Sequence, residues 1–367
     1  MILLGLRYAV RERTRSAITA AGVACAVVLT VFLAGVYCGA VRGSLGYIER
    51  ADADLWVARP GTWNLMRPGG LLPVSARARL EAQPDVLSAE PVLTGLLPAL
   101  VDGSPHTLLL VGLSGDARSG RPRRIESGRA VPGPGEIVID RAFALRAARR
   151  VGDTLEVAGR QFRVAGTSRE TNLLVTQYAF VRAADLDSLT GLRGMATFFL
   201  VRTAPGRAGE VARWLGHSRE IVVFTRGEFL ENNRREISSG FLPVLWAVAL
   251  LGLAVGGMVV ALMSYAAVLE KRADYALLAA LGGSDARRLG VLLQQSLGAS
   301  LAGAAVGLVL LVALEHLLPL LVPEIELQVG IPLAGAAVAG AVAMAVLGAW
   351  IPARLAVNVP PMEALRR

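Results

Sequence analysis

The sequence predicts an α-helical membrane protein with four transmembrane helices and a large extracytoplasmic α+β domain between the first and the second. The 367-residue chain is 54% hydrophobic, and its mean hydropathy of +0.52 exceeds that of ordinary soluble domains. Four apolar stretches are each long enough to cross a bilayer core of about 30 Å. Between the first and the second lie roughly two hundred residues of mixed character, enough for one or two domains.

Charge and cysteine content narrow the class further. The net charge is +9, but the arginines are scattered without an aromatic platform, which argues against nucleic acid as a partner. Cys25 and Cys38 both fall in the first apolar stretch. They are too far apart along one helix to bond each other, so we expect small packing residues there. A disulfide bond between one of these cysteines and another chain is the remaining possibility.

The chain begins with a cytoplasmic segment and a membrane span. Residues 1–16 contain four arginines among apolar residues, which predicts an interfacial helix. Residues 17–40 are apolar and uncharged. This stretch is longer than the apolar core of a signal peptide, so we expect a retained first span.

Residues 41–239 form the predicted extracytoplasmic domain. Apolar runs predict strands at 108–113, 135–140, 178–182 and 198–202, and a helix is expected at 141–150. Residues 154–157 and 161–164 alternate around Ala158-Gly159-Arg160, which predicts a hairpin. The Pro- and Gly-rich residues 130–135 are expected to form a loop.

Three further spans are predicted at 241–269, 291–321 and 331–351. They are joined by a connection at 270–290 and a short loop at 322–330, and a tail follows at 352–367. Basic residues gather near residue 10, in the connection and in the tail, whereas the short loop contains Glu324 and Glu326. Because basic loops stay in the cytoplasm, both termini and the connection are predicted to be cytoplasmic.

Small residues spaced four apart predict close helix packing in three of the spans, either within one subunit or across a homodimer. These residues are Gly35, Gly39, Gly252, Gly256, Gly303 and Gly307.

The connection at 270–290 is the segment around which the function is expected to be organised. Tyr275, Leu278 and Leu281 recur at helical spacing between charged ends, one of which contains Lys271 and Arg272. An amphipathic helix of this kind can lie on lipid, present a face to a cytosolic partner, or merely reverse the chain.

The same segment resembles a known family, the FtsX-like, or MacB-type (type VII), ABC transporter permeases. RADYALLAALGGS is similar to the coupling segment of that family, R-x-E-I-x-x-L-R-A-L-G-A-S. The matching or like-charged positions include Arg272, Asp274, Leu278, Leu281, Gly282 and Ser284. The sequence departs from the family at Asp274 (usually Glu), at Ala279 (usually Arg) and at Gln295 (often Glu).

Two further parts of the chain carry the resemblance. The tail IPARLAVNVPPMEALRR is similar to the family ending, with matches that include Pro352, Arg354, Pro361, Glu363, Leu365 and Arg366. Residues 135–167 resemble the MacB-like periplasmic core domain, and residues 51–64 resemble the DevC-like exporter branch.

The resemblance implies a non-catalytic permease subunit in a bacterial inner membrane, working as a homodimer with a separate ABC ATPase. ATP and Mg²⁺ would be bound by that ATPase, and a periplasmic adaptor is a possible partner. The sequence agrees with a separate ATPase in one respect: it contains no G-x-x-x-x-G-K-[ST] phosphate loop. Its three histidines have no metal-ligand spacing, and His316 beside Glu315 is expected to be a satisfied pair near the interface.

Two functions follow from the resemblance. In the first, the permease couples ATP hydrolysis to movement of the extracytoplasmic domain, for export or extraction of a substrate. The alternative is an FtsX-type signalling scaffold that switches a cell-wall hydrolase, although the predicted outer domain is larger than that role requires.

Overall fold

The computed structural model describes residues 13–101, 103–173, 176–270, 285–323, 325 and 327–357. The chain divides into two compact units. The helical unit contains Met1–Cys38, Leu242–Leu318 and Leu327–Arg367, and the α+β unit contains Gly39–Phe241 and Pro319–Glu326.

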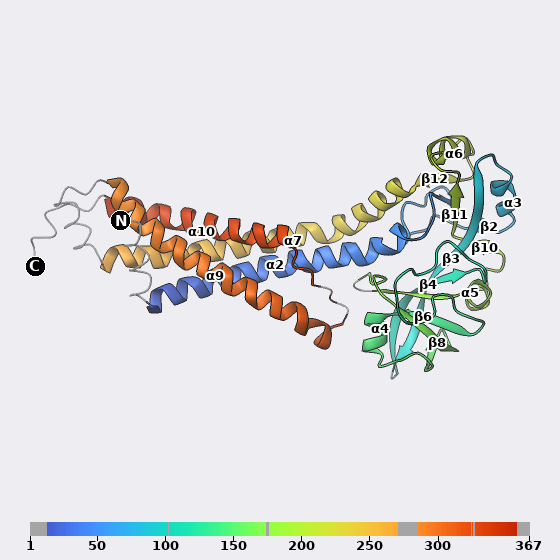
Figure 1. Ribbon diagram of the computed structural model, residues 1–367, viewed down its shortest axis with the longest axis horizontal. Coiled ribbons are helices and arrows are strands. Elements are labelled where there is room, and N and C mark those ends of the chain that lie inside the picture. Colours follow the sequence, from blue (N-terminus) through green and yellow to red (C-terminus); the bar gives the residue numbers. More distant parts are fainter. Residues whose placement is uncertain are drawn as a thin grey trace, which may run out of the picture. The chain divides into compact units, whose positions relative to one another are not determined.

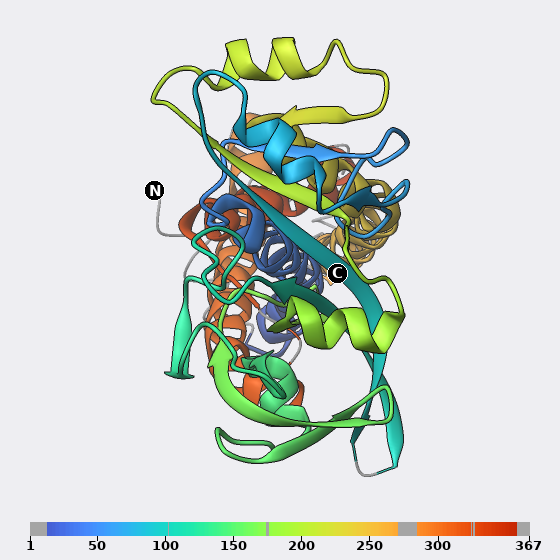
Figure 2. The ribbon, with the colours of Figure 1, turned by 90° about the vertical axis from the view of Figure 1, so that its right-hand side faces the viewer.

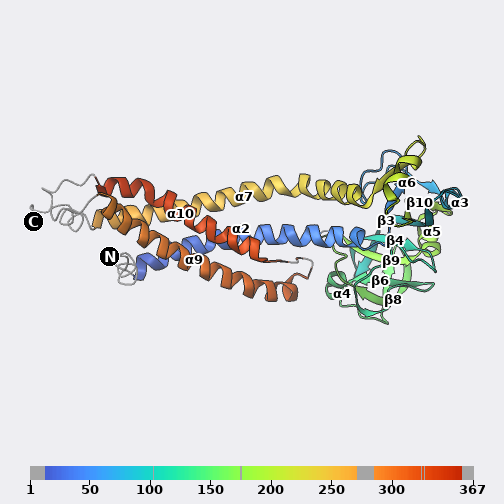
Figure 3. The same ribbon diagram turned by 45° about the horizontal axis from the view of Figure 1, so that its top comes forward.

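Four long helices lie alongside one another in the helical unit (Figures 1 and 3). They are α2 (Arg13–Glu49), α7 (Arg226–Glu270), α9 (Asp285–Leu321) and α10 (Ile331–Val357). Their apolar parts are long enough to cross a membrane at Thr14–Glu49, Leu242–Glu270, Leu292–Leu321 and Ile331–Trp350. The predicted fold class, four membrane helices with an inserted α+β domain, is confirmed.

Two of these helices extend well beyond the spans predicted at 17–40 and 241–269. Helix α2 has 37 residues and α7 has 45, which correspond to about 55 and 68 Å at 1.5 Å per residue. A bilayer core needs only about 30 Å. The additional turns, from Gly39 in α2 and up to Phe241 in α7, belong to the α+β unit.

Glycines bring the membrane helices close together. A Cβ at Gly252 or Gly256 of α7 would press against α2 at Ala26 and its neighbours, and Gly256 also faces Met344 of α10. Small residues permit such backbone approach in lipid, where apolar burial alone drives little association.

The α+β unit contains twelve strands in its described residues, ten of them in one sheet. The strands are β1 (Leu55–Ala58), β2 (Leu72–Pro73), β3 (Val86–Val101), β4 (Ser104–Leu113), β5 (Ile125–Gly128), β6 (Glu136–Asp140), β7 (Thr154–Val157), β8 (Arg160–Ser168), β9 (Gln177–Arg182), β10 (Met195–Ala196), β11 (Phe198–Thr203) and β12 (Val222–Thr225). The short helices are α3 (Ala76–Glu81), α4 (Arg141–Arg146), α5 (Ala183–Thr190) and α6 (Ala208–Leu215).

One part of the sheet closes into a barrel. Its strands pair in the order β3-β4-β9-β6-β8, and β7 pairs with both β8 and β3, which completes the ring. The apolar residues inside include Leu108, Ile137, Phe162 and Val181. Closure of this kind removes free strand edges.

The remaining part of the sheet is open and is connected to the barrel by β3, the long teal strand in Figure 2. The first half of β3 pairs with β11, and β1 lies between β11 and β12. Successive side chains of β1 point to opposite faces of the sheet, so they enter two different cores. Leu55 and Val57 pack with residues of α3 and α6, whereas Trp56 and Ala58 belong to the core that also contains Tyr47 of α2 and Phe229 of α7.

Most strands predicted from apolar runs are confirmed, as β4, β6, β9 and β11. The predicted hairpin is formed by β7 and β8. Ala158 and Gly159 at its turn both have positive φ angles, of 49° and 79°, which a type I′ turn requires. The helix expected at 141–150 ends earlier, at Arg146, and Asp140 caps it by accepting a hydrogen bond from the Ala142 amide (2.7 Å).

Candidate functional site

The residues predicted to couple to the ATPase, and most of the tail residues that match the family ending, lie outside the described residues. These are Lys271, Arg272, Asp274, Tyr275, Leu278, Leu281, Gly282 and Ser284 in the connection, and Pro361, Glu363, Leu365 and Arg366 in the tail. Their contacts therefore stay predictions. Two tail residues are described: Pro352 is buried in α10, and the Arg354 guanidinium lies 5.0 Å from the centre of the Trp350 ring.

Polar contacts join three helices at the end of the helical unit that borders the connection. Arg15 of α2 forms an ion pair with Glu270, the last residue of α7, at 2.7 Å. The hydroxyls of Ser264 in α7 and Ser296 in α9 are 3.0 Å apart and buried. Gln295, where the family often has Glu, is also buried there. The buried Ser264–Ser296 contact is strengthened by its apolar surroundings, whereas the Glu270 side chain is 69% exposed. These contacts connect this end of α7 to α9 and to α2.

The predicted packing glycines face other helices of the same chain. Gly303 and Gly307 of α9 approach the backbone of α2 at Ala20 and Ala24. Gly35 approaches Leu327 and Gln328, which precede α10. Together with Gly252 and Gly256, five of the six residues therefore make close contacts within one subunit.

The far end of α2 is embedded in the α+β unit. Tyr47 and Ile48 are almost completely buried, and the Tyr178 hydroxyl donates to the Ser44 carbonyl at 3.4 Å. Burial raises the pKa of Tyr178, with a smaller contribution from Tyr47 beside it. A Cβ at Gly43 would collide with the Asn172 carbonyl oxygen. Glycine therefore permits the helix to lie directly against the loop that precedes β9.

The first turns of α7 enter the same core from another direction. Phe229 is fully buried and stacks on Trp56 of β1, with ring centroids 4.4 Å apart. One turn later, Asn233 donates to the Phe229 carbonyl (2.7 Å) and accepts from the Leu65 amide (3.0 Å). Helix α7 is thus attached both to the sheet and to the loop after β1.

An aromatic cluster connects the two helix ends. Trp56 lies between Tyr47 of α2 and Phe229 of α7, with edge-on contact to Tyr47 at 6.4 Å. Phe198 contacts both Trp56 and Phe229, and Phe180 contacts Tyr47. Both helix ends are therefore in direct side-chain contact with β1, β9 and β11, in an interior of the close-packed kind.

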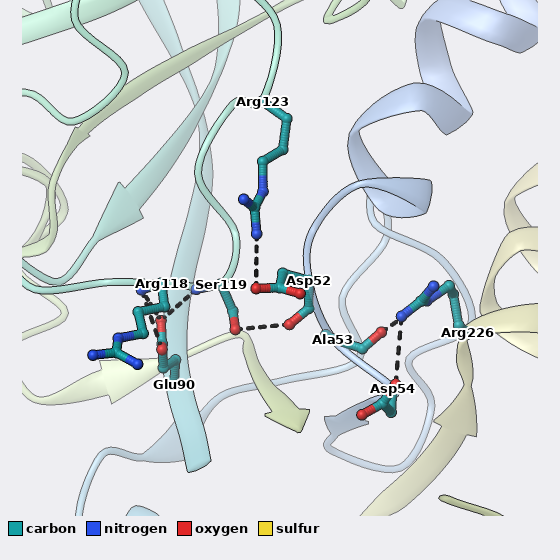
Figure 4. A network of polar contacts seen from close by, with 8 residues as sticks. All are labelled: Asp52, Ala53, Asp54, Glu90, Arg118, Ser119, Arg123 and Arg226. Atoms are coloured by element: carbon teal, nitrogen blue, oxygen red, sulfur yellow. Dashed lines mark hydrogen bonds and ion pairs between the residues drawn. The ribbon is translucent and has the colours of Figure 1, made fainter. Parts of the chain in front are cut away.

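A polar network surrounds the turn between α2 and β1 (Figure 4). Asp54 accepts from the Thr203 amide at 2.9 Å and forms an ion pair with Arg226 at 3.4 Å. Asp52, whose φ of 57° is unusual for a residue other than glycine, forms an ion pair with Arg123 at 2.7 Å.

The loop after β4 supports that turn from the other side. The Ser119 hydroxyl donates to the Asp52 carbonyl (2.9 Å), and the Gly120 amide donates to the Ala51 carbonyl (2.7 Å). The buried carboxylate of Glu90 accepts from the amides of Arg118 and Ser119, each at 2.9 Å. These contacts fix the end of α2 to β3 as well as to β1.

This junction of α2, α7 and the sheet has no signature in the sequence. Its residues come from positions 43–56, 90, 118–123, 178–203 and 226–233, and none forms a local motif. One feature of the sequence could have indicated it. Residues 45–48 are apolar although they follow the charged Arg42, beyond the length that a membrane span needs.

Comparison with known proteins identifies the chain. Residues 16–214 match the MacB-like periplasmic core domain family, and residues 246–361 match the FtsX-like permease C-terminal family. The chain belongs to the MacB/FtsX-type ABC transporter permeases. It is a multi-pass membrane protein whose α+β unit is a periplasmic core domain.

Relatives named as uncharacterized ABC transporter permeases occur in two strains of Mycobacterium tuberculosis. Each is 25% identical to this permease over 325 residues, which is 88% of either chain. Among solved structures, the periplasmic region of MacB from Actinobacillus actinomycetemcomitans aligns with a TM-score of 0.39 at 13% identity, covering 48% of this chain and 90% of that one. The extracellular domain of the transporter YknZ from Gram-positive bacteria aligns with a TM-score of 0.37 at 13% identity, over 47% of this chain and 100% of its own.

Proposed function

We propose that this permease transmits movement from a separate ATPase in the cytoplasm to its periplasmic domain, for export or extraction of a substrate. The observation that carries the proposal is the continuity of α7. Its last residue, Glu270, immediately precedes the predicted coupling segment. Its first turn supplies Phe229 to the aromatic cluster of the periplasmic domain.

A continuous helix is suited to this task because every backbone hydrogen bond along it resists bending. Pro243 interrupts this series of hydrogen bonds beside the start of the span at Leu242, because proline has no backbone N–H to donate. The Arg15–Glu270 pair and the Ser264–Ser296 contact tie the coupling end of α7 to α2 and α9. Because α2 also ends in the aromatic cluster, a displacement at that end reaches the periplasmic domain through two helices.

The proposed assembly follows from the family and from charge placement. Both termini and the coupling segment are in the cytoplasm of a bacterial cell, because the connecting segments there are basic. Two copies of the permease bind two copies of the ATPase, which holds ATP and Mg²⁺. A periplasmic adaptor and the surrounding lipid complete the list of proposed partners, and the permease itself holds no cofactor.

The coupling segment provides the direct test. Leu278→Asp combined with Leu281→Asp places charge on the apolar face of the predicted helix, where we propose that it enters a groove on the ATPase. We expect the ATPase activity of the reconstituted complex to lose its dependence on the permease. The matched control is Ala276→Asp, on the opposite side of that predicted helix. Coupling that survives the double substitution would refute the docking role.

A further inference from the structure

The end of α2 is contacted by a short segment that comprises the last residue of β8 and the four residues after it, 168–172, called the post-β8 segment below. The Asn172 carbonyl lies so close to Gly43 of α2 that a Cβ there would collide with it. The Glu170 carboxylate forms an ion pair with Arg50, which directly follows α2. The post-β8 segment therefore holds α2 through both its backbone and a side chain.

The post-β8 segment is itself attached to a buried carboxylate, that of Asp140. The Thr171 hydroxyl donates to this carboxylate at 2.6 Å and lies 2.7 Å from the Ser168 hydroxyl. The carboxylate also accepts from the Ala142 amide at 2.7 Å. Between the two hydroxyl residues, Glu170 has a φ of 59°, which is unusual for a residue with a side chain. Such a conformation persists only where the surrounding contacts impose it.

The charge of Asp140 is not balanced by a cation. Asp140 is 2% exposed, and its partners among the described residues are hydroxyl and amide groups. The charged residues beside it contact one another, since Arg141 and Arg169 both pair with Glu126 of β5. Tyr178 of β9 is neutral, because burial raises its pKa. A buried charge without a counter-ion is destabilising, and local opening of the fold returns it to water.

We propose that protonation of Asp140 strengthens the hold of the post-β8 segment on α2. While the carboxylate is charged, opening of this segment hydrates the charge and is therefore favoured. Once a proton from the solvent has bound to a carboxylate oxygen, opening no longer has that advantage. As a control on the movement of α2, the device rests on the proposed transmission, whereas the contact itself is a property of the permease alone.

The sign and the range of the effect follow from the pKa of Asp140. Burial raises this pKa to about 6, above the ordinary value of 3.8. The closed segment therefore binds the proton more readily than the opened one. The gain in stability is absent above about pH 6, grows as the pH falls, and is complete below about pH 4.

The test measures hydrogen exchange at residues 43–50 of the full-length permease, in phosphatidylcholine nanodiscs without the ATPase. Rates are corrected for the intrinsic effect of pH on exchange. Protection of these residues should rise roughly tenfold between pH 7 and pH 5. Asp140→Asn, which does not titrate in this range, should abolish the rise.

Variants at Thr171 distinguish titration of Asp140 from a general change in packing. Thr171→Val removes a hydroxyl that stabilises the charged carboxylate, so the midpoint of the pH dependence should move to higher pH. Thr171→Ser keeps the hydroxyl and should keep the wild-type midpoint. The matched control is Asp185→Asn, at a buried carboxylate of α5 that pairs with Arg160 at 2.8 Å. It should leave the pH dependence at α2 unchanged.

Three results would overturn the proposal: protection at residues 43–50 that is equal at pH 7 and pH 5, a full pH dependence in Asp140→Asn, or an unshifted midpoint in Thr171→Val. A gain of protection at α4 alone would also overturn it, because the proton would then bind without any effect on α2. None of these results bears on the transmission of movement, whose failure would appear as an absent response to ATP in the complex with the ATPase.

Discussion

Arg226 holds the start of α7 against Asp54, the residue that leads from α2 into β1. The Arg226 guanidinium lies 3.4 Å from the Asp54 carboxylate, and the Arg226 amide donates to the Asp54 carbonyl at 3.0 Å. The guanidinium also donates to the Ala53 carbonyl at 2.9 Å. The two helices that leave the membrane are therefore joined directly at their periplasmic ends, in addition to their shared aromatic core.

Removal of the Arg226 side chain should loosen the contact between the start of α7 and the residues before β1, without unfolding the periplasmic domain. Arg226→Met keeps the backbone contact but deletes the ion pair, worth about 0–1 kcal/mol when half exposed, and one hydrogen bond worth about 1 kcal/mol. We expect faster hydrogen exchange at residues 50–58 and 226–233, equivalent to a loss of about 1–2 kcal/mol. Arg235→Met, which breaks an exposed pair with Glu231 on the same helix, should leave those amides unchanged.

Close packing of α2 on the periplasmic domain should depend on Gly43. Gly43→Ala forces a methyl group toward the Asn172 carbonyl, and overpacking of this kind costs about 1–3 kcal/mol. The expected result is a lower melting temperature of the purified permease. Gly240→Ala in α7 has open space around its Cβ and should stabilise by about 0.5–1 kcal/mol. If both variants change the melting temperature in the same direction and by the same amount, the close approach at Gly43 does not limit the size of the side chain there.

The glycines of α9 should support the fold of one subunit. A side chain at Gly303 would meet the Ala20 carbonyl of α2, so Gly303→Val should destabilise the permease by about 1–3 kcal/mol. Gly335→Val, at an open position of α10, is the control for added bulk. Size-exclusion chromatography separates the alternatives: a Gly303→Val variant that melts normally but loses its dimer would assign this glycine to an interface between copies.

Asp140 should make the stability of the periplasmic domain depend on pH. Burial raises the pKa of this carboxyl to about 6, although hydrogen bonds from Thr171 and from backbone amides oppose the shift. The folded state therefore binds the proton more readily than the unfolded chain, whose pKa is near 3.8. Stability from this group is absent above pH 6, grows as the pH falls and is complete below about pH 4, with a total on the order of 2–3 kcal/mol.

The Asp140→Asn variant provides the reference for that dependence. Asparagine can still accept from the Ala142 amide but does not titrate in this range. The wild-type protein should gain protection at α4, β6 and β8 relative to the variant as the pH is lowered from 7 to 5, measured by hydrogen exchange. A constant difference between the two proteins across that range would contradict the assignment.

The strands and spans that could be predicted are those with strong local patterns. The apolar runs that became β4, β6 and β9 needed no tertiary information, and the Ala158-Gly159 turn marked its hairpin. The long strand β3 gave no such signal, because Pro91, Gly95 and Pro98 interrupt its sequence. It forms because its two halves pair with different partners, β11 and β4.

The helix junction could not be predicted for a related reason. Tyr47, Trp56 and Phe229 come together only when β1 is inserted between β11 and β12. Hydropathy marks where α2 and α7 cross lipid but not where they end, because the additional turns are stabilised by packing against the sheet. The coupling segment was the opposite case: local periodicity indicated it clearly, although its contacts depend on a second protein.

The most direct test of the account is hydrogen exchange in the complete complex with its ATPase. Residues 44–58 and 222–233 should change protection when ATP is bound by an ATPase partner that cannot hydrolyse it, relative to the nucleotide-free complex. That change should disappear in the Leu278→Asp, Leu281→Asp variant. Identical protection of both segments with and without ATP in the wild-type complex would contradict the transmission of movement through α2 and α7.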